Sequence, residues 1–291
     1  MDYLRQRSAT SAPAFKAPPN ACDCHAHIFG PATRFGLAES RSYTPPDASR
    51  EEYLAMLATL GIKRMVIVQP SVYGFDNDCT TEAVEAFGTS RARSIVMIRP
   101  DTPNTELRRL HGTGARGVRF ITVSPGGGSL DQLRDVATRI APFGWHIQMY
   151  VPAQTWHDLA PMVKELPVPI VMDHMAGIMA NHGDSELGYS AVLRLLDTGR
   201  CWVKLSGYRS SVEGHPYADV APLARRLASH VPDHCVWGTD WPHPHLQGHM
   251  QDDGALLDLL AAWVPDIAAR HRILTDNPAR LYGFAQGEEG H

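Results

Sequence analysis

Two histidines one residue apart stand near the start of the chain, in the sequence Cys-Asp-Cys-His-Ala-His. If this stretch is a β-strand, alternate side chains share a face, so we expect Asp23, His25 and His27 to point the same way. Cys22 and Cys24 would then point to the other face. Two imidazoles on one face can hold a metal ion or a polar group of a substrate. Histidines that are merely hydrogen-bonded near a barrel rim show the same pattern, so the motif needs partners elsewhere in the chain.

A carboxylate and a third imidazole follow later strand-like runs. Asp240 is the best candidate for a general base, because it ends the last run and Trp237 and Trp241 would exclude water and raise its pKa. His174 ends the sixth run and could polarise a carbonyl or stabilise an oxyanion. Asp173 precedes it and is expected to face the opposite way. The sequence therefore predicts an acid–base site opposite the histidine pair.

Two arginines favour an anionic ligand. Arg119 lies inside the apolar fourth run, where a charge is costly unless it is paired, and Arg209 follows the seventh run. Bidentate pairing would suit them to a carboxylate or a similar anion. Histidines 243 and 245 lie beside Asp240 and are either neighbours of the site or ordinary loop residues. The other polar side chains at or just beyond the ends of strand runs are Gln69, Ser71, Gln148, Tyr150, Ser206 and Tyr208.

Composition excludes several classes of function. The 291 residues carry a formal net charge of −4 and no run of Lys or Arg, which argues against a nucleic-acid partner. The five cysteines fit neither a zinc-finger spacing nor a secreted disulfide framework, so reduced thiols in a cytoplasm are expected. No apolar run has transmembrane length, so no membrane partner is expected. Residues 1–20 lack the apolar core of a signal peptide and are predicted to form an extended arm before one domain over residues 21–291.

Strand and helix patterns alternate along the chain. The predicted strands are Ala21–Phe29, Arg64–Gln69, Ser94–Ile98, Gly117–Thr122, Trp145–Val151, Pro169–His174, Cys201–Ser206 and Cys235–Asp240. The predicted helices are Ser49–Leu60, Asn104–His111, Leu130–Phe143, Thr155–Glu165, Glu186–Asp197, Tyr217–His230, Gly254–Trp263 and Ala268–Leu281. Eight such alternations predict an α/β fold, a (β/α)₈ TIM barrel. A doubly wound sheet is the alternative, but no Gly-x-Gly-x-x-Gly follows the first strand. Gly126–Gly128 is more typical of a turn or lid than of a phosphate cradle.

Several motifs together resemble the amidohydrolase superfamily. They are Cys-His-Ala-His, Val-Met-Asp-His-Met, Val-Lys-Leu-Ser-Gly-Tyr, Trp-Gly-Thr-Asp-Trp-Pro-His-Pro and Asp-Asn-Pro-Ala-Arg-Leu-Tyr, helped by Arg-Ser-Tyr-Thr-Pro, Gly-Phe-Asp-Asn and Gly-Val-Arg-Phe. The resemblance runs from about Asn20 to Phe284. It is greatest to the branch of TIM-barrel lactonases that includes the 2-pyrone-4,6-dicarboxylate hydrolases.

The resemblance implies a hydrolase that opens a carboxylated or otherwise anionic lactone. Asp240 would activate water and His174 would hydrogen-bond the scissile carbonyl. The anion would be held by Arg119 and Arg209 with two tyrosines. Those tyrosines are Tyr43 and Tyr150, and the strand-end residues Ser71 and Tyr208 complete the predicted substrate-binding set.

Metal use is left open by the resemblance. The superfamily often binds zinc through residues matched by His25, His27, His174 and Asp240, whereas the pyrone hydrolases work without metal. One divalent ion at this mononuclear site and metal-independent action are therefore both expected possibilities. The fourth strand lacks a lysine at its C-terminal end, which rules out the bridged binuclear site of other members.

The loop after Phe120 departs from the pyrone hydrolase pattern. It reads Ile-Thr-Val-Ser-Pro-Gly-Gly-Gly and lacks the second arginine of those enzymes. A muconolactone, a sulfonated relative or a sugar-acid lactone is therefore also a candidate substrate, and a homo-oligomer stays open. The alternatives are a zinc-dependent decarboxylase, a sugar-acid lactone isomerase and an anion-binding barrel without catalysis.

Overall fold

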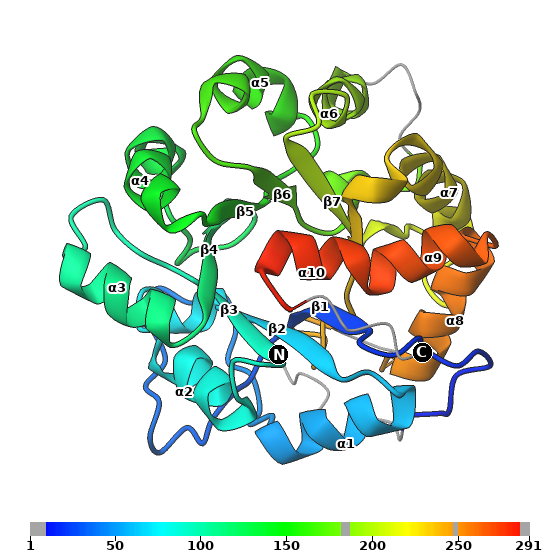
Figure 1. The fold of residues 1–291 in the computed structure, drawn as a ribbon, viewed down its shortest axis with the longest axis horizontal. Helices are drawn as coiled ribbons and strands as arrows, with labels where there is room; N and C mark the ends of the chain where they lie inside the picture. Colours follow the sequence, from blue (N-terminus) through cyan, green and yellow to red (C-terminus); the bar gives the residue numbers. More distant parts are fainter. Residues whose placement is uncertain (1–9, 182–186, 247–249, 286–291) are drawn as a thin grey trace.

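Eight parallel strands close into a barrel in the computed structural model, which describes residues 10–181, 187–246 and 250–285 (Figure 1). Each strand pairs with the next one in the chain, and a bridge between Ala26 and Trp241 brings the last segment back to the first. The strands are β1 (Cys22–Ala26), β2 (Arg64–Val68), β3 (Ala92–Val96), β4 (Ala115–Ile121), β5 (His146–Tyr150), β6 (Ile170–Met172), β7 (Cys201–Leu205) and β8 (Cys235–Trp237). The predicted (β/α)₈ barrel is confirmed.

Helices surround the barrel and cover the outer face of its strands. They are α1 (Arg50–Leu60), α2 (Asp78–Phe87), α3 (Asn104–Gly112), α4 (Leu133–Ile140), α5 (Thr155–Glu165), α6 (Leu187–Leu196), α7 (Ala221–His230), α8 (Asp253–Trp263), α9 (Ile267–Leu274) and α10 (Asp276–Tyr282). Helix α2 was not predicted, because its buried face consists mostly of small residues and threonines rather than a leucine stripe. The predicted closing helix is two helices, since Thr275 has non-helical φ/ψ of −126° and −65°.

Helix α1 shows how local sequence sets these boundaries. The Ser49 side chain accepts a hydrogen bond from the backbone of Glu52, whose carboxylate accepts one from the backbone of Ser49. This capping box satisfies amide groups that the first turn leaves unpaired. Gly61 ends the helix in the left-handed conformation, with φ of 71°.

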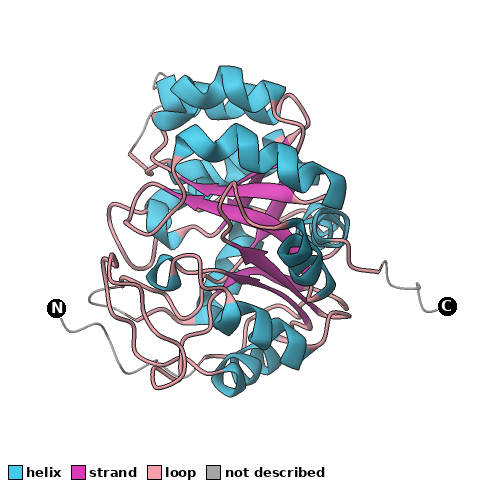
Figure 2. Ribbon diagram, turned by 90° about the vertical axis from the view of Figure 1, so that its left-hand side faces the viewer, coloured by secondary structure: helices cyan, strands magenta, loops and turns pink. Residues whose placement is uncertain are grey.

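An apolar cluster lies in the lower part of the barrel interior, which α10 closes. Inward-facing side chains such as Cys22, Cys24 and Val66 form a buried cluster with Tyr282 of α10. Figure 1 shows α10 across this end of the barrel. Arg93 holds the helix in place through a hydrogen bond from its Nε to the Tyr282 carbonyl (2.9 Å). In the turned view of Figure 2, long loops gather at the opposite end, where the strands finish. An active site is expected at that open end.

A β-bulge in β1 changes which residues face the barrel interior. Asp23 pairs with Met65 while Ala26 pairs with Ile67, so a three-residue step on β1 lies opposite a two-residue step on β2. The extra residue breaks the alternation of side chains. Sequence alone does not show such a bulge, because its composition matches that of a regular strand.

The predicted common face of Asp23 with the two histidines is therefore wrong. The Asp23 carboxylate accepts hydrogen bonds from the Tyr53 hydroxyl of α1 (3.0 Å) and from the Thr239 hydroxyl (2.6 Å). His25 and His27 point into the upper barrel instead, where their rings lie 5.1 Å apart. Asp23 thus anchors β1 to its surroundings and takes no place beside the imidazoles.

The segment before β1 packs against α8. The backbone amide of Ser11 donates to Asp252 (2.9 Å), and that of Ala14 donates to Asp258 (2.7 Å). Part of the predicted arm, residues 1–9, lies outside the described residues. The division into an arm and one domain stays a prediction.

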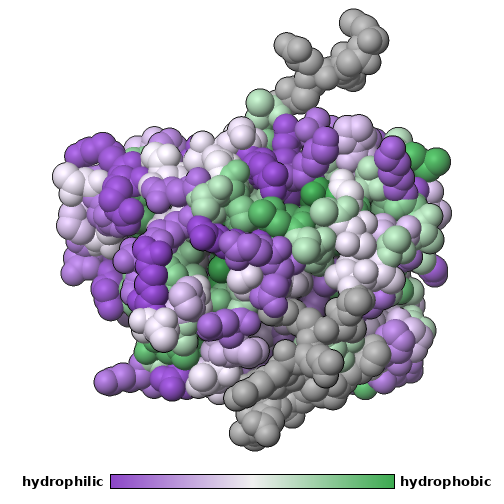
Figure 3. All heavy atoms as spheres, turned by 90° about the horizontal axis from the view of Figure 1, so that it is seen from below, coloured by the Kyte–Doolittle hydropathy of each residue, from purple (hydrophilic) through white to green (hydrophobic). Residues whose placement is uncertain are grey.

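The described surface carries both hydrophilic and hydrophobic side chains. Hydrophilic side chains surround smaller hydrophobic areas on the face shown in Figure 3. The large hydrophobic side chains exposed among the described residues are Val123, Leu187, Val212 and Ile267. No helix in the described parts of the chain is both long and apolar enough to cross a membrane.

Candidate active site

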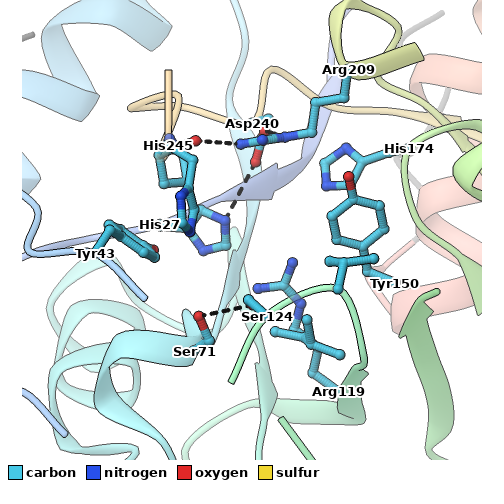
Figure 4. Close-up of a pocket in the computed structure, with 13 residues that line it drawn as sticks. His27, Tyr43, Ser71, Arg119, Ser124, Tyr150, His174, Arg209, Asp240 and His245 are labelled. Atoms are coloured by element: carbon cyan, nitrogen blue, oxygen red, sulfur yellow. Dashed lines mark hydrogen bonds and ion pairs between the residues drawn. The ribbon is translucent and has the colours of Figure 1, made fainter. Parts of the chain in front are cut away.

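A cavity of about 210 Å³ opens at the C-terminal ends of the strands (Figure 4). It is lined by His27, Tyr43, Ser71, Arg119, Ile121, Val123, Ser124, Tyr150, His174, Arg209, Asp240, Pro244 and His245. Two more predicted residues reach this site through Asp240. The Tyr208 hydroxyl donates to Asp240 (2.6 Å), and His25 Nε2 lies 3.6 Å from its other oxygen. The structure thus brings together side chains that the sequence spreads over more than 200 positions.

Asp240 has one oxygen held and one oxygen without a hydrogen-bond partner. Its Oδ2 accepts from the Tyr208 hydroxyl and from Arg209 Nε (2.5 Å). Its Oδ1 is buried without a hydrogen bond and lies 3.4 Å from His27 Nε2. A carboxylate held on one side and open on the other is arranged to accept a proton at the open oxygen.

The predicted increase in the pKa of Asp240 is wrong. Burial raises the pKa of this carboxyl, but the Arg209 guanidinium and the nearby histidines outweigh burial and hold it well below its usual range. Trp241 does not enclose the carboxylate, since its ring packs against Tyr53 at 5.1 Å. Asp240 is therefore an ionised, weak base rather than a strong one.

His27 presents a nitrogen lone pair to Asp240. Its Nδ1 lies 2.6 Å from the Val68 carbonyl, which can only accept, so Nδ1 carries the hydrogen. Burial lowers the pKa of His27 and keeps the ring neutral. A neutral ring protonated at Nδ1 has a free lone pair at Nε2. That lone pair faces the open oxygen of Asp240.

His174 is held by an unusual backbone conformation. Its φ of 49° is left-handed, its Nδ1 lies 2.8 Å from the Ser206 hydroxyl, and the Tyr150 ring meets its ring edge-on at 4.5 Å. Burial lowers the pKa of His174 to about 3, so the ring is neutral. The left-handed residue also breaks the strand alternation, so His174 faces the same side as Asp173 instead of the opposite one. Asp173 points into the barrel with its Oδ1 3.4 Å from His25 Nδ1, and the prediction that it faces away from His174 is wrong.

The two arginines differ in how far they are already engaged. Arg119 reaches in from β4, donates from Nη1 to the Gln69 carbonyl (2.8 Å) and places Nη2 3.5 Å from His25 Nε2. Arg209 is bound to Asp240 and to the Pro244 carbonyl (2.7 Å). Both line the cavity, but Arg119 has more donor capacity left for an incoming anion.

The mouth of the cavity is built from loops. The Tyr43 ring packs 4.0 Å from the His245 ring, and the Ser124 hydroxyl contacts that of Ser71 at 3.4 Å. The sequence predicts no specific role for His245. Its position close to Asp240 in the chain was the one indication that it could lie at the site. His243 turns away from the cavity, and its Nε2 lies 3.2 Å from Asp253.

Sequence reasoning missed a buried polar layer below the cavity. Three fully buried side chains contact one another there. They are Lys204 of β7, Gln148 of β5 and Asp173, which directly follows β6. The rule that marked Arg119, a charge inside an apolar strand, applies equally to Lys204 in Trp-Val-Lys-Leu.

The donor atoms fit one divalent metal ion. Ligand atoms of His25, His27 and Asp240 lie within 4.8 Å of one another, as do those of His25, Asp173 and His174. Neutral imidazoles and a carboxylate with an unpaired oxygen are the donor set of a mononuclear zinc site. The balance of charge in the site does not require the metal ion, however. Two buried carboxylates already face three cationic side chains, which are Arg119, Lys204 and Arg209.

Buried imidazoles predict a loss of stability in acid. Burial lowers the pKa of His146 and of His174 to about 3, so the unfolded chain takes up these protons while the folded chain does not. Each imidazole removes about 1.4 kcal/mol of unfolding free energy per pH unit between its unfolded and folded pKa. Asp23, whose pKa burial raises to about 6, offsets one of them below that pH. We expect the urea midpoint to fall as the pH drops from about 6.5 to 4, and a constant midpoint would contradict this.

Glycines let the loop after β4 lie against the strand ends. A Cβ at Gly127 would lie 2.0 Å from the Ile121 carbonyl oxygen, a backbone atom that cannot move away cheaply. We expect Gly127→Ala to displace the loop, raise KM and destabilise the fold by about 1–3 kcal/mol. Gly112→Ala in α3 is the control, since nothing lies within 4 Å of its Cβ position. Kinetics and thermal melts would compare them, and equal behaviour of the two variants would refute the packing argument.

A (β/α)₈ barrel with His-x-His at the end of β1, a histidine after β6 and an aspartate after β8 defines the amidohydrolase class. The family model described as "Amidohydrolase" matches residues 22–284, and the chain belongs to this family of enzymes.

Two of the similar proteins are named as lactone hydrolases. The chain is 41% identical over 286 residues to 4-sulfomuconolactone hydrolase of Rhizobium radiobacter, covering 94% of each chain. It is 37% identical over 288 residues to 2-pyrone-4,6-dicarboxylate hydrolase of Comamonas testosteroni, covering 94% of this chain and 93% of that one. An apo crystal structure from Agrobacterium tumefaciens superposes with a TM-score of 0.87 at 32% identity, covering 95% of this chain and 100% of that one. The resemblance noted from the motifs is confirmed.

Proposed function

We propose that this protein hydrolyses a small lactone that carries a carboxylate or sulfonate. One observation carries the proposal. The Asp240 carboxylate, fixed at one oxygen and unpaired at the other, faces a cavity that also holds His174 and Arg119. The relatives' names, a sulfomuconolactone hydrolase and a pyrone dicarboxylate hydrolase, support the same substrate class.

The size and charge of the cavity support a compact anionic substrate. A volume of about 210 Å³ is small for a ligand site and suits a single ring with short substituents. Arg119 is the main anchor for the anionic group, and Tyr150, Tyr43 and Ser71 offer hydroxyls around it. Arg209 contributes its charge while it holds Asp240.

Hydrolysis requires a base, an oxyanion donor and room for one water molecule. Asp240 Oδ1 takes a proton from water as the water oxygen bonds to the lactone carbonyl carbon. His174 donates from Nε2 to the oxyanion, with Ser206 donating to its Nδ1 to set that tautomer. The intermediate then collapses, the ring C–O bond breaks, and the ring oxygen leaves as a hydroxyl with the proton held by Asp240. The product is a hydroxy acid.

A metal ion has a possible place in this scheme. His25, His27 and Asp240 would hold it, and it would supply Lewis-acid polarisation of the lactone carbonyl. The steps above use only the side chains of this chain. Metal analysis of protein purified without added ions, combined with activity before and after chelation, measures the ion's contribution.

The test is a panel of carboxylated, sulfonated and neutral lactones followed by proton release and product mass. We expect proton release and a product heavier by one water, with anionic lactones turned over much faster than neutral ones. An unchanged mass would identify an isomerase, and carbon dioxide release would identify a decarboxylase. Ligand binding without reaction across the panel would favour an anion-binding barrel.

A further inference from the structure

The layer of buried polar residues below the cavity has no part in the proposed reaction, yet it contacts His25. Lys204, Asp173 and Gln148 project from three neighbouring strands and are fully buried. Buried charges are costly unless each one is paired, so a layer of this kind needs an explanation. The hydrogen bonds that each group can donate or accept explain why these residues are buried together.

Lys204 has already committed most of its hydrogens. Its Nζ donates to the Cys24 carbonyl (2.8 Å) and to Gln148 Oε1 (2.7 Å). The third N–H lies between Asp173 Oδ1 at 3.4 Å and His25 Nδ1 at 3.5 Å. An ammonium has three hydrogens, and the negative carboxylate attracts the last one more strongly than a neutral ring nitrogen does. Lys204 therefore leaves His25 Nδ1 without a donor.

Asp173 can accept a further hydrogen where His25 can supply one. Its Oδ2 accepts from Gln148 Nε2 (2.9 Å), whereas its Oδ1 is buried and makes no close hydrogen bond. A carboxylate oxygen has two lone pairs, so one stays open even when Lys204 points an N–H at Oδ1 from 3.4 Å. That oxygen lies 3.4 Å from His25 Nδ1. A buried acceptor is stabilised by any donor within reach, so the hydrogen of the imidazole belongs on Nδ1.

The other side of the ring faces a donor and a more distant acceptor. His25 Nε2 lies 3.5 Å from Arg119 Nη2, and a guanidinium only donates. A lone pair at Nε2 meets this donor favourably, whereas a hydrogen there would oppose it. Asp240 Oδ1 lies 3.6 Å from Nε2, farther than Asp173 Oδ1 lies from Nδ1, so the nearer carboxylate favours the hydrogen on Nδ1.

We propose that Asp173, supported by Lys204 and Gln148, is a positioning residue that fixes His25 as the Nδ1–H tautomer and turns its Nε2 lone pair to the cavity. His27 has the same tautomer through the Val68 carbonyl. Two lone pairs and Asp240 Oδ1 then face one another without a hydrogen between them. The water to be activated supplies those hydrogens, one to Asp240 and one to an imidazole. This orients its oxygen lone pair toward the substrate, an interpretation that rests on the proposed function.

The tautomer itself is measured by ¹⁵N NMR of the histidine rings in the intact protein. We expect His25 to show a protonated Nδ1 and an unprotonated Nε2, with the signal assigned by its absence from the His25→Gln variant. A protonated Nε2 would overturn the proposal. This measurement requires neither a substrate nor a folded Asp173 variant, so it distinguishes a failure of the inference from a failure of the lactonase proposal.

Asp173→Asn tests the consequence. We expect a rise in the Nε2–H tautomer of His25, a fall in kcat of about 10- to 100-fold with little change in KM, and a similar loss of any Zn²⁺ affinity. Asp23→Asn is the matched control, because Asp23 is an equally buried carboxylate that bonds the backbone amide of His25 (3.1 Å) but not its ring. The proposal is refuted if both variants keep the wild-type ring signals, or if both lower kcat equally.

Discussion

Replacing Asp240 with asparagine is expected to lower kcat by about 10³-fold or more while a lactone still binds. The carboxamide nearly matches the carboxylate in shape but cannot take a proton from water. Its oxygen can still accept from the Tyr208 hydroxyl and from Arg209, so the cavity should keep its form. Single-turnover kinetics and calorimetric titration with a slow lactone would separate chemistry from binding.

Loss of the Asp240 charge also has a structural cost that must be separated from catalysis. Breaking one partner of a buried ion pair destabilises a fold by about 3–5 kcal/mol, and Arg209 would lose its carboxylate. Asp253→Asn is the control, since Asp253 is also buried and contacts a histidine, His243, outside the cavity. Both variants should melt at a lower temperature, but only Asp240→Asn should lose turnover. Retained turnover in Asp240→Asn would reject Asp240 as the base.

Strand order and the identity of most cavity residues were predictable from the sequence. Parallel strands bring their C-terminal ends to one edge, so residues at the ends of separate apolar runs must meet there. His27, His174, Arg119 and Asp240 all line the cavity at this edge. Features that depend only on the average geometry of a barrel can thus be predicted without coordinates.

Local backbone irregularities were not predictable. The bulge in β1 removes Asp23 from the histidine face, and the left-handed φ of His174 turns its imidazole to the same side as Asp173. Neither feature leaves a glycine or proline to mark it in the sequence. Because a shift of one residue reverses a side chain's direction, small departures decide which carboxylate joins the site.

Electrostatic consequences were the hardest to predict. The pKa of Asp240 was expected to rise because tryptophans neighbour it in the sequence, yet Arg209, a residue 31 positions away, decides the direction. Lys204 and Asp173 are also far apart in the sequence, so their contact was not predicted either. Charge pairing depends on contacts across the barrel, whereas sequence patterns report mainly on neighbours along a strand.

Arg119→Met is expected to lower kcat/KM for a carboxylated lactone by about 100-fold, since a charge-assisted hydrogen-bonded contact contributes up to about 3 kcal/mol. The side chain is buried at the cavity and has donors to spare beyond its bond to the Gln69 carbonyl. A neutral lactone of the same ring size should lose much less, because it never used the charge. Arg109→Met is the matched control, because Arg109 pairs with Glu106 on the surface of α3, away from the cavity.

Comparing both substrates on each variant isolates the role of Arg119. If Arg119→Met lowers kcat/KM equally for charged and neutral lactones, the guanidinium acts through Asp173 and His25, which it also contacts, rather than through the substrate. A loss confined to the charged lactone assigns Arg119 to recognition of the anion. In the site, two buried carboxylates face three cationic side chains, which leaves an excess of positive charge. The anionic group of the substrate would then balance that excess charge.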